Sequence, residues 1–176
     1  PDEVAYCRVV ALFNHEEIGS RTSEGAFCEL LKQLIAAHGI DLASSVEDSF
    51  LISSDVAHGV HPNYRQLYAT NADCKLGAGP VLKFDYNGSY ITSMATALVA
   101  RKLASMVQVP LQNMFNSNSN RGGSTVGPML AAGLGIRGVD LGAPIFAMHS
   151  IREMGAVKDL EHLTRFFEAA LSKYTE

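Results

Sequence analysis

The sequence is organised around residues 9–20, which read Val9-Val10-Ala11-Leu12-Phe13-Asn14-His15-Glu16-Glu17-Ile18-Gly19-Ser20. Residues 9–13 are apolar and too few for a helix, so they predict a buried strand of an α/β sheet. Glu16 and Glu17 would then lie at the carboxyl end of that strand, where open α/β sheets bind ligands. One carboxylate there can hold a metal ion while its neighbour accepts a proton from water. An isolated Glu-Glu pair more often lies on a solvated surface, and both interpretations stay open at this point.

Size and composition favour one domain, residues 1–176, since 47% of the residues are hydrophobic and no Pro- or Ser-rich tract divides the chain. The net charge is -4 and the 14 Lys and Arg residues are scattered. We therefore expect small-molecule or peptide partners, and neither nucleic acid nor a membrane. No apolar run has the length of a membrane span and no signal-peptide order is evident, so we expect a cytoplasmic protein.

The three cysteines, Cys7, Cys28 and Cys74, are far apart and form no Cys-x-x-Cys pair. This spacing disfavours a disulfide framework or a thiolate zinc site. We expect all three to be buried or partly buried small hydrophobic residues.

The middle of the chain alternates predicted strands and helices. Thr22 or Ser23 can cap a helix that ends at Gly39, with an apolar face of Phe27, Leu30, Leu31, Leu34 and Ile35. A short strand over 49–53 leads directly into Asp55, and a loop over 63–79 follows. Asn87-Gly88 predicts a hairpin between 81–85 and 89–92. A helix over 93–107 should follow, with an apolar face of Ala95, Leu98, Val99, Lys102, Leu103 and Met106.

The last third of the chain continues this alternation. We expect a strand over 111–115, a short helix from Gly127-Pro128 to Ala132, and a strand over 139–141. His149 then follows the end of a further strand, and Ser150-Ile151-Arg152-Glu153 is a capping-box pattern. A closing helix should bury Leu160, Leu163, Phe167, Ala170, Leu171 and Tyr174.

Three predicted strand ends thus carry Glu16–Glu17, Asp55 and His149. Carboxylate and imidazole ligands together suit zinc, with cobalt or manganese as less suitable ions. Taken singly, Asp55 can be a plain cap and His149 a turn histidine. Their coincidence at one edge of a doubly wound sheet favours a metal site.

Other catalytic motifs fail at specific residues. His15-Glu16 would need a histidine at 19 to form a helical zinc-protease motif, and that residue is Gly19. Ser124 lacks the glycine at 126 that a nucleophile elbow requires. The glycines of 133–138 have dinucleotide-binding spacing but precede a strand, so we expect no dinucleotide cofactor.

Five segments together resemble the aspartyl aminopeptidase family: residues 13–20 (Phe-Asn-His-Glu-Glu-Ile-Gly-Ser), 54–64 (Ser-Asp-Val-Ala-His-Gly-Val-His-Pro-Asn-Tyr), 79–83 (Gly-Pro-Val-Leu-Lys), 123–128 (Gly-Ser-Thr-Val-Gly-Pro) and 140–153, which holds Ala-Met-His-Ser-Ile-Arg-Glu. The resemblance covers nearly the whole chain in the right order. It implies a three-layer α/β/α sandwich around a mixed, mostly parallel sheet, and a zinc peptidase with a paired-metal centre that removes N-terminal Asp or Glu from peptides. It also implies a homo-oligomer, a dodecamer in the family.

The resemblance assigns expected roles to individual residues. Glu16 matches the general base that activates the attacking water. Glu17 and His149 match ligands of one zinc ion, and Asp55 matches a ligand of the other. Asp55, His58, Lys83 and Tyr90 fall where the family contacts substrate. The chemistry agrees, because an acidic substrate side chain needs cationic or hydrogen-bonding partners, which Lys83 and His58 can supply.

The resemblance also implies parts that these residues do not contain: an upstream histidine ligand, an aspartate that bridges both metals, and an inserted dimerisation domain. Because the chain begins at Pro1 without an initiator Met, we expect the C-terminal part of a catalytic domain that is inactive by itself. Ser119, in the polar run 116–120, stands near a position where relatives carry an aspartate.

The sequence therefore predicts a two-zinc metalloaminopeptidase for N-terminal Asp or Glu. An alternative is a non-catalytic truncated paralogue that acts in assembly or peptide binding. A third is a related zinc exopeptidase or deacylase with a different side-chain preference. The upstream coding sequence separates the first two, and a substrate panel separates the third.

Overall fold

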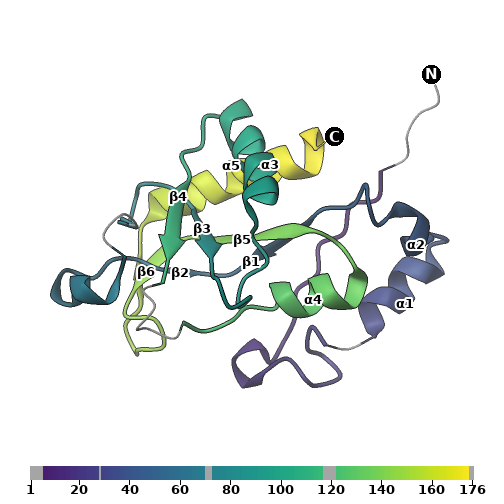
Figure 1. The fold of residues 1–176 in the computed structure, drawn as a ribbon, viewed down its shortest axis with the longest axis horizontal. Helices are drawn as coiled ribbons and strands as arrows, with labels where there is room; N and C mark the ends of the chain where they lie inside the picture. Colours follow the sequence, from purple (N-terminus) through teal and green to yellow (C-terminus); the bar gives the residue numbers. More distant parts are fainter. Residues whose placement is uncertain (1–5, 28, 70–72, 117–121, 175–176) are drawn as a thin grey trace.

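The computed structural model describes residues 6–27, 29–69, 73–116 and 122–174 (Figure 1). Its centre is a four-stranded sheet in the order β1 (Leu51–Ser54), β5 (Gly138–Gly142), β3 (Val81–Phe84) and β4 (Gln112–Phe115). β1 runs parallel to β5, and β3 runs parallel to β4, while β3 and β5 are antiparallel. The expectation of a mixed, mostly parallel sheet is confirmed.

A second, three-stranded sheet continues the first beyond Asp55. It has the order β2 (Ala57–His58), β6 (Pro144–Phe146) and β7 (Met154–Gly155). β2 pairs with β6 in parallel, just as β1 pairs with β5. The backbone amides of Asp55 and Ala57 donate to the carbonyls of Leu141 and Ala143, so the pairing carries on from one sheet to the next.

Helices cover both faces of the central sheet, which confirms the three-layer expectation (Figure 1). α3 (Met94–Met106) and α5 (Val157–Lys173) lie on one face. α4 (Gly127–Leu134) lies on the other, with α1 (Leu30–Ala37) and α2 (Leu42–Ser45) beside it. Two short 3₁₀ helices, η1 (Glu16–Ile18) and η2 (Pro62–Leu67), complete the described elements. None of the helices in the described part of the chain is long and apolar enough to span a bilayer.

The main core lies between the sheet and the α3–α5 layer. Its buried members are Leu82, Ala97, Ala100, Leu103, Ala104, Val109, Val139, Leu141 and Phe166. The predicted apolar face of α3 is confirmed for Leu103 and Val99 but wrong for Leu98 and Met106, which are 65% and 49% exposed. α3 instead turns its alanines inward, which lets the helix approach the sheet and Phe166 closely.

The closing helix α5 buries Phe166 and Ala169, with Leu163, Phe167, Ala170 and Tyr174 packed against the core as predicted. Leu160 and Leu171 are exposed, so that part of the predicted face is wrong. The apolar stripe is shifted by one residue because Asp159 and His162 take buried positions at the start of the helix. The Asp159 carboxylate there accepts hydrogen bonds from the amides of Gly77 and Gly79.

The predicted buried strand over 9–13 is wrong. These residues form no strand, and Leu12 is 94% exposed. A strand needs a neighbour to complete its hydrogen-bond ladder, and no strand in the described ranges lies alongside this segment. Residues 9–13 therefore have the composition of a core strand but no strand to pair with in the described ranges.

The predicted hairpin is also wrong in its second half. Residues 81–84 form β3 and Gly88 adopts a turn conformation with φ 79°, but 89–92 form no strand. Both edges of β3 are already occupied, by β4 and by β5, so no edge remains for a returning strand. The Asp85 carboxylate accepts from the amides of Asn87 and Ser89, which stabilises the turn on its own.

Smaller corrections concern the ends of elements and the cysteines. The helix predicted from residue 22 or 23 begins only at Leu30, and the loop over 63–79 contains most of η2. The capping-box pattern at 150–153 starts no helix, because α5 begins at Val157. Cys74 is buried as predicted, whereas Cys7 is exposed. Cys28 and Ser119 lie outside the described residues.

Candidate active site

Asp55 and Lys83 form a partly buried ion pair at the carboxyl edge of the sheet. Asp55 directly follows β1, and Lys83 reaches it from β3, with 3.3 Å between Nζ and Oδ2. Lys83 is 2% exposed and Asp55 is 38% exposed. Burial lowers the pKa of the Lys83 ammonium, while the carboxylates of Asp55, Asp140 and Glu16 act in the opposite direction.

Gly142 in β5 makes this placement of Asp55 possible. A Cβ at position 142 would lie 1.7 Å from the backbone oxygen of Asp55. Only a residue without a side chain lets the two backbones come this close.

Tyr90 lies against the same ammonium. The Nζ of Lys83 is 5.5 Å from the centre of the Tyr90 ring, a cation–π distance, and Tyr90 is buried. Burial, followed by the charges of Asp140, Asp85 and Asp55, raises the pKa of Tyr90 to about 12. The ring thus stays neutral and can act as a hydrogen-bond donor at any physiological pH.

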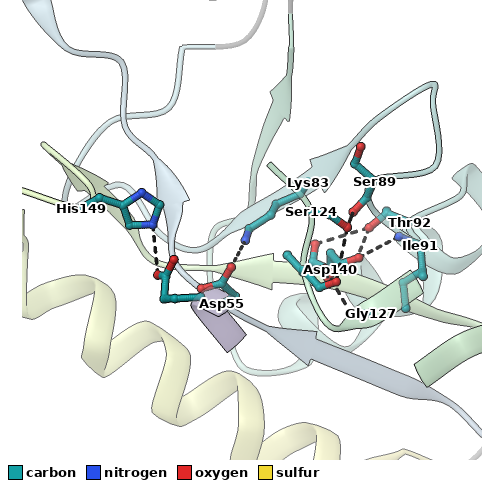
Figure 2. A network of polar contacts seen from close by, with 11 residues as sticks. Asp55, Lys83, Ser89, Ile91, Thr92, Ser124, Gly127, Asp140 and His149 are labelled. Carbon is teal, nitrogen blue, oxygen red and sulfur yellow. Dashed lines mark hydrogen bonds and ion pairs between the residues drawn. The ribbon is translucent and has the colours of Figure 1, made fainter. Parts of the chain in front are cut away.

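Asp140 is the buried centre of the polar network drawn in Figure 2, and no sequence-based expectation gave it a role. Its carboxylate accepts from the amide of Ile91 at 2.7 Å (Figure 2). It also accepts from the hydroxyl of Thr125 at 2.6 Å. It is fully buried in β5. The signal available in the sequence was a single Asp inside an apolar strand, Val139-Asp140-Leu141, because buried carboxylates need several partners.

Glu16 and Glu17 reach the same edge from η1. The preceding His15 has φ 64° and the following Gly19 and Ser20 have φ 95° and 60°, so the short helix is held between left-handed residues. The pKa of Glu16 is raised, first by burial and then by the like charges of Asp55 and Glu17, against the opposing effect of Lys83 and His149. A carboxylate with a raised pKa accepts a proton more readily.

Glu17 and His149 meet across a long sequence distance. The Oε1 of Glu17 and the Nε2 of His149 are 3.0 Å apart, and both side chains are exposed. Figure 2 shows His149 on one side of Asp55 and Lys83 on the other.

His58, the second residue of β2, shares this electrostatic environment. Partial burial lowers the pKa of His58, with Lys83 and His149 acting in the same direction and Asp55 opposing them. Ion pairs, the contact between Lys83 and Tyr90, and mutual electrostatic effects thus link the seven residues named from the sequence: Glu16, Glu17, Asp55, His58, Lys83, Tyr90 and His149. Their roles in binding and catalysis stay predictions.

The chemistry of this donor set suits zinc. Two ligand atoms on a tetrahedral zinc ion lie about 3.3 Å apart, close to the spacing of the Glu17 oxygen and the His149 nitrogen. In the described part of the chain no group of three or more His, Cys, Asp or Glu side chains is arranged to hold an ion. The residues present fit zinc as a pair of ligands, with the Asp55 carboxylate nearby.

Comparison with known proteins places this chain in a family. The model of the aminopeptidase I zinc metalloproteases (M18) matches residues 2–170. Aspartyl aminopeptidase 4 of Saccharomyces cerevisiae is 38% identical over 190 residues, an alignment that covers 99% of this chain and 39% of that protein.

Solved structures agree with the match. The cryo-EM structure of the Ape4 and Nbr1 complex superposes with a TM-score of 0.86 at 38% identity, over 90% of this chain and 31% of that chain. The S. cerevisiae mApe1 dodecamer gives a TM-score of 0.80 at 29% identity, over 92% of this chain and 37% of that chain. The chain thus spans well under half the length of these proteins, and it belongs to the M18 family of aminopeptidase I zinc metalloproteases.

Proposed function

We propose that the protein carrying this chain is a zinc aminopeptidase that releases N-terminal Asp or Glu from peptides, with two zinc ions in its complete centre. The observation that carries the proposal is that seven expected site residues, from five separate segments, gather around the ion pair of Asp55 and Lys83. The family match and the similarity to an aspartyl aminopeptidase support it.

Bound zinc supplies Lewis-acid chemistry, since it polarises the scissile carbonyl and lowers the pKa of water. Glu17, His149 and Asp55 are the residues that would hold it. Glu16 accepts a proton from the attacking water and delivers it to the leaving amine. Its raised pKa suits both transfers, because the same carboxyl group must take and return the proton.

Lys83 and His58 would bind the acidic side chain of the substrate. Within the described residues, the buried ammonium of Lys83 has one ion-pair partner, Asp55. An ammonium has three donors, so donors remain for a second anion. A charge-assisted hydrogen bond to that ammonium favours Asp and Glu over neutral residues. Tyr90 holds the ammonium in place through its ring.

The test is the hydrolysis of Asp-, Glu- and Ala-anilides by the full-length, zinc-loaded protein. Lys83→Ala and Lys83→Met should lower kcat/KM for Asp-anilide by about 100-fold while changing Ala-anilide hydrolysis far less, because the lost interaction is worth about 3 kcal/mol. Lys158→Ala, which removes an exposed lysine of α5, is the matched control. An equal loss on all three substrates would contradict the assigned role of Lys83.

The role of Glu16 has its own test. Glu16→Gln keeps the shape of the side chain and removes the base, so kcat should fall by about 100- to 10,000-fold with zinc content unchanged. Retained turnover in this variant would contradict the mechanism. Inactivity of the 176 residues alone stays a prediction, checked by the same assay with added zinc.

We also infer a homo-oligomer. The support is the structure of the mApe1 dodecamer, which is similar to this chain over 92% of its length. Light scattering of the full-length protein measures its mass directly, and a monomeric mass would contradict this inference.

A further inference from the structure

His149 sits in the loop that joins β6 to β7. The ladder between these strands ends at Phe146 opposite Met154, so residues 147–153 form a closed hairpin loop on a fixed base. Glu153 is the last residue before β7 and is thereby anchored to that base.

The backbone of this loop adopts an unfavourable conformation. Ala147 has φ 57° and His149 has φ 68°, the left-handed region that residues with a Cβ rarely adopt. Such a conformation persists only where neighbouring groups hold it. Two backbone contacts contribute, because Ser150 N donates to Ala147 O at 3.0 Å and Arg152 N donates to the Ser150 hydroxyl oxygen at 3.1 Å.

The contact on His149 itself comes from Glu153. The Glu153 Oε1 accepts the amide hydrogen of His149 at a donor–acceptor distance of 2.6 Å. This is the shortest of the three contacts, and it is the one that holds the amide of His149 itself.

The imidazole has no second support among the described residues. Its Nε2 faces Glu17, and no hydrogen-bond partner of Nδ1 is found within the described ranges. Zinc-binding histidines usually have their direction fixed by a partner on the second ring nitrogen. Here the direction of the ring must come from the backbone, and Glu153 is the side chain that holds this backbone.

We propose that Glu153 is a positioning residue for His149: its carboxylate holds the His149 amide and the left-handed backbone, which aims Nε2 at the metal edge beside Glu17. The inference rests on the proposed function in taking His149 as a zinc ligand. Glu153 contacts neither substrate nor zinc and acts only through the direction of the imidazole.

The experiment compares Glu153→Ala, Glu153→Gln and the control Glu161→Ala in the full-length, zinc-loaded protein. Zinc transfer to a chromogenic chelator is followed by absorbance, and amide exchange of the peptide containing residues 147–153 is followed by mass spectrometry. Glu161 is an exposed glutamate on α5, away from the loop. Glu153→Ala should bind zinc about 10- to 100-fold more weakly, and its loop amides should exchange faster.

Glu153→Gln shows whether the hydrogen bond to the His149 amide or the negative charge of Glu153 matters. In Glu153→Gln the amide oxygen still accepts from His149, so zinc affinity should stay within about threefold of wild type. Zinc retention in Glu153→Ala equal to that in Glu161→Ala would overturn the inference. So would Glu153→Gln behaving like Glu153→Ala, because the charge and not the hydrogen bond would then matter.

Amide exchange of residues 147–153, measured on zinc-free protein, tests the role of Glu153 independently of the proposed function. If wild type binds no zinc, or if His149→Ala retains it fully, the proposed function fails. Faster loop exchange in zinc-free Glu153→Ala would still support the hold on the backbone, and unchanged exchange would overturn it.

Discussion

Lys83 and His149 lie on either side of Asp55, yet Lys83 is 2% exposed and His149 is 66% exposed. Lys83 belongs with Tyr90 and Asp140 to a group of buried side chains, here called the buried half, and Asp55, whose side chain is 38% exposed, lies between the two groups. Glu16, Glu17 and His149 come from η1 and the β6–β7 loop and form the exposed half. Side chains of the buried half are part of what stabilises the fold, whereas those of the exposed half can be exchanged at little cost to folding. Variants of the exposed half should therefore alter function with little change in stability, whereas variants of the buried half should change stability, and Lys83 variants should change both.

The largest difference between exposed and buried positions should appear in the labelling rates of two thiols, Cys7 and Cys74. Cys7 lies in the exposed segment that leads to η1, and Cys74 is packed with Val81, Tyr90 and Met114. Burial, with the charge of Asp73, raises the pKa of Cys74 to about 12. Iodoacetamide at pH 8 should label Cys74 at least about 1000-fold more slowly than Cys7, because reaction requires opening of the core and loss of the thiol proton. Peptide mass spectrometry gives both rates, and they should converge in urea; similar rates in native protein would break the division.

Asp140→Ala should give the largest loss of stability. It leaves the Ile91 amide and the Thr125 hydroxyl buried without their acceptor. We expect the free energy of unfolding in urea to fall by about 3–5 kcal/mol. Asp48→Ala, at an exposed aspartate, should change it by less than about 0.5 kcal/mol. If Asp140→Ala lowered the free energy of unfolding no more than Asp48→Ala does, the hydrogen bonds of Asp140 would not stabilise the fold.

Ser53→Ala should raise the free energy of unfolding, the opposite of the effect expected for Asp140→Ala. Ser53 lies opposite Asp140 in the β1–β5 pairing, and among the described residues its buried Oγ has no hydrogen-bond partner. Removing that oxygen should raise the free energy of unfolding by about 0.5–1 kcal/mol. The exposed neighbour Ser54 is the control, since Ser54→Ala should have no measurable effect. A destabilised Ser53→Ala would mean that the hydroxyl has a partner after all.

His149→Ala should have the smallest effect on folding. The Glu17–His149 pair is exposed, so its loss should change the free energy of unfolding by less than about 0.5 kcal/mol. Zinc content of the full-length protein should nevertheless fall. Urea unfolding and zinc analysis of the same preparation check both statements, and a destabilisation above about 1 kcal/mol would place His149 in the buried half.

Local sequence patterns predicted elements where local forces decide. The Ser93–Thr96 capping box starts α3 at Met94, and an apolar run followed by Asp55 gives β1. Sequence alone could not show which strands compete for an edge, so residues 89–92 were expected to pair with a strand whose edges β4 and β5 already occupy. Residues 9–13 have strand composition but no neighbour in the described ranges.

The candidate site was predictable where polar residues follow strands, as Asp55 and His149 do. Lys83 and Asp140 lie inside strands and do not follow that pattern. The family resemblance supplied Lys83, since a lone lysine in a strand usually points to solvent. Nothing supplied Asp140, whose importance comes from partners at positions 91 and 125 that the sequence does not place beside it.

The two ion pairs of the site differ in exposure, and this difference decides how each responds to ionic strength. Lys83, which is 2% exposed, approaches Asp55 from inside the protein, while Glu17 and His149 meet in solvent. Dissolved ions screen the solvent-exposed pair over about 10 Å at 0.1 M salt but barely reach the shielded ammonium. Rising salt should therefore loosen the link between η1 and the β6–β7 loop while the attraction between Lys83 and Asp55 persists.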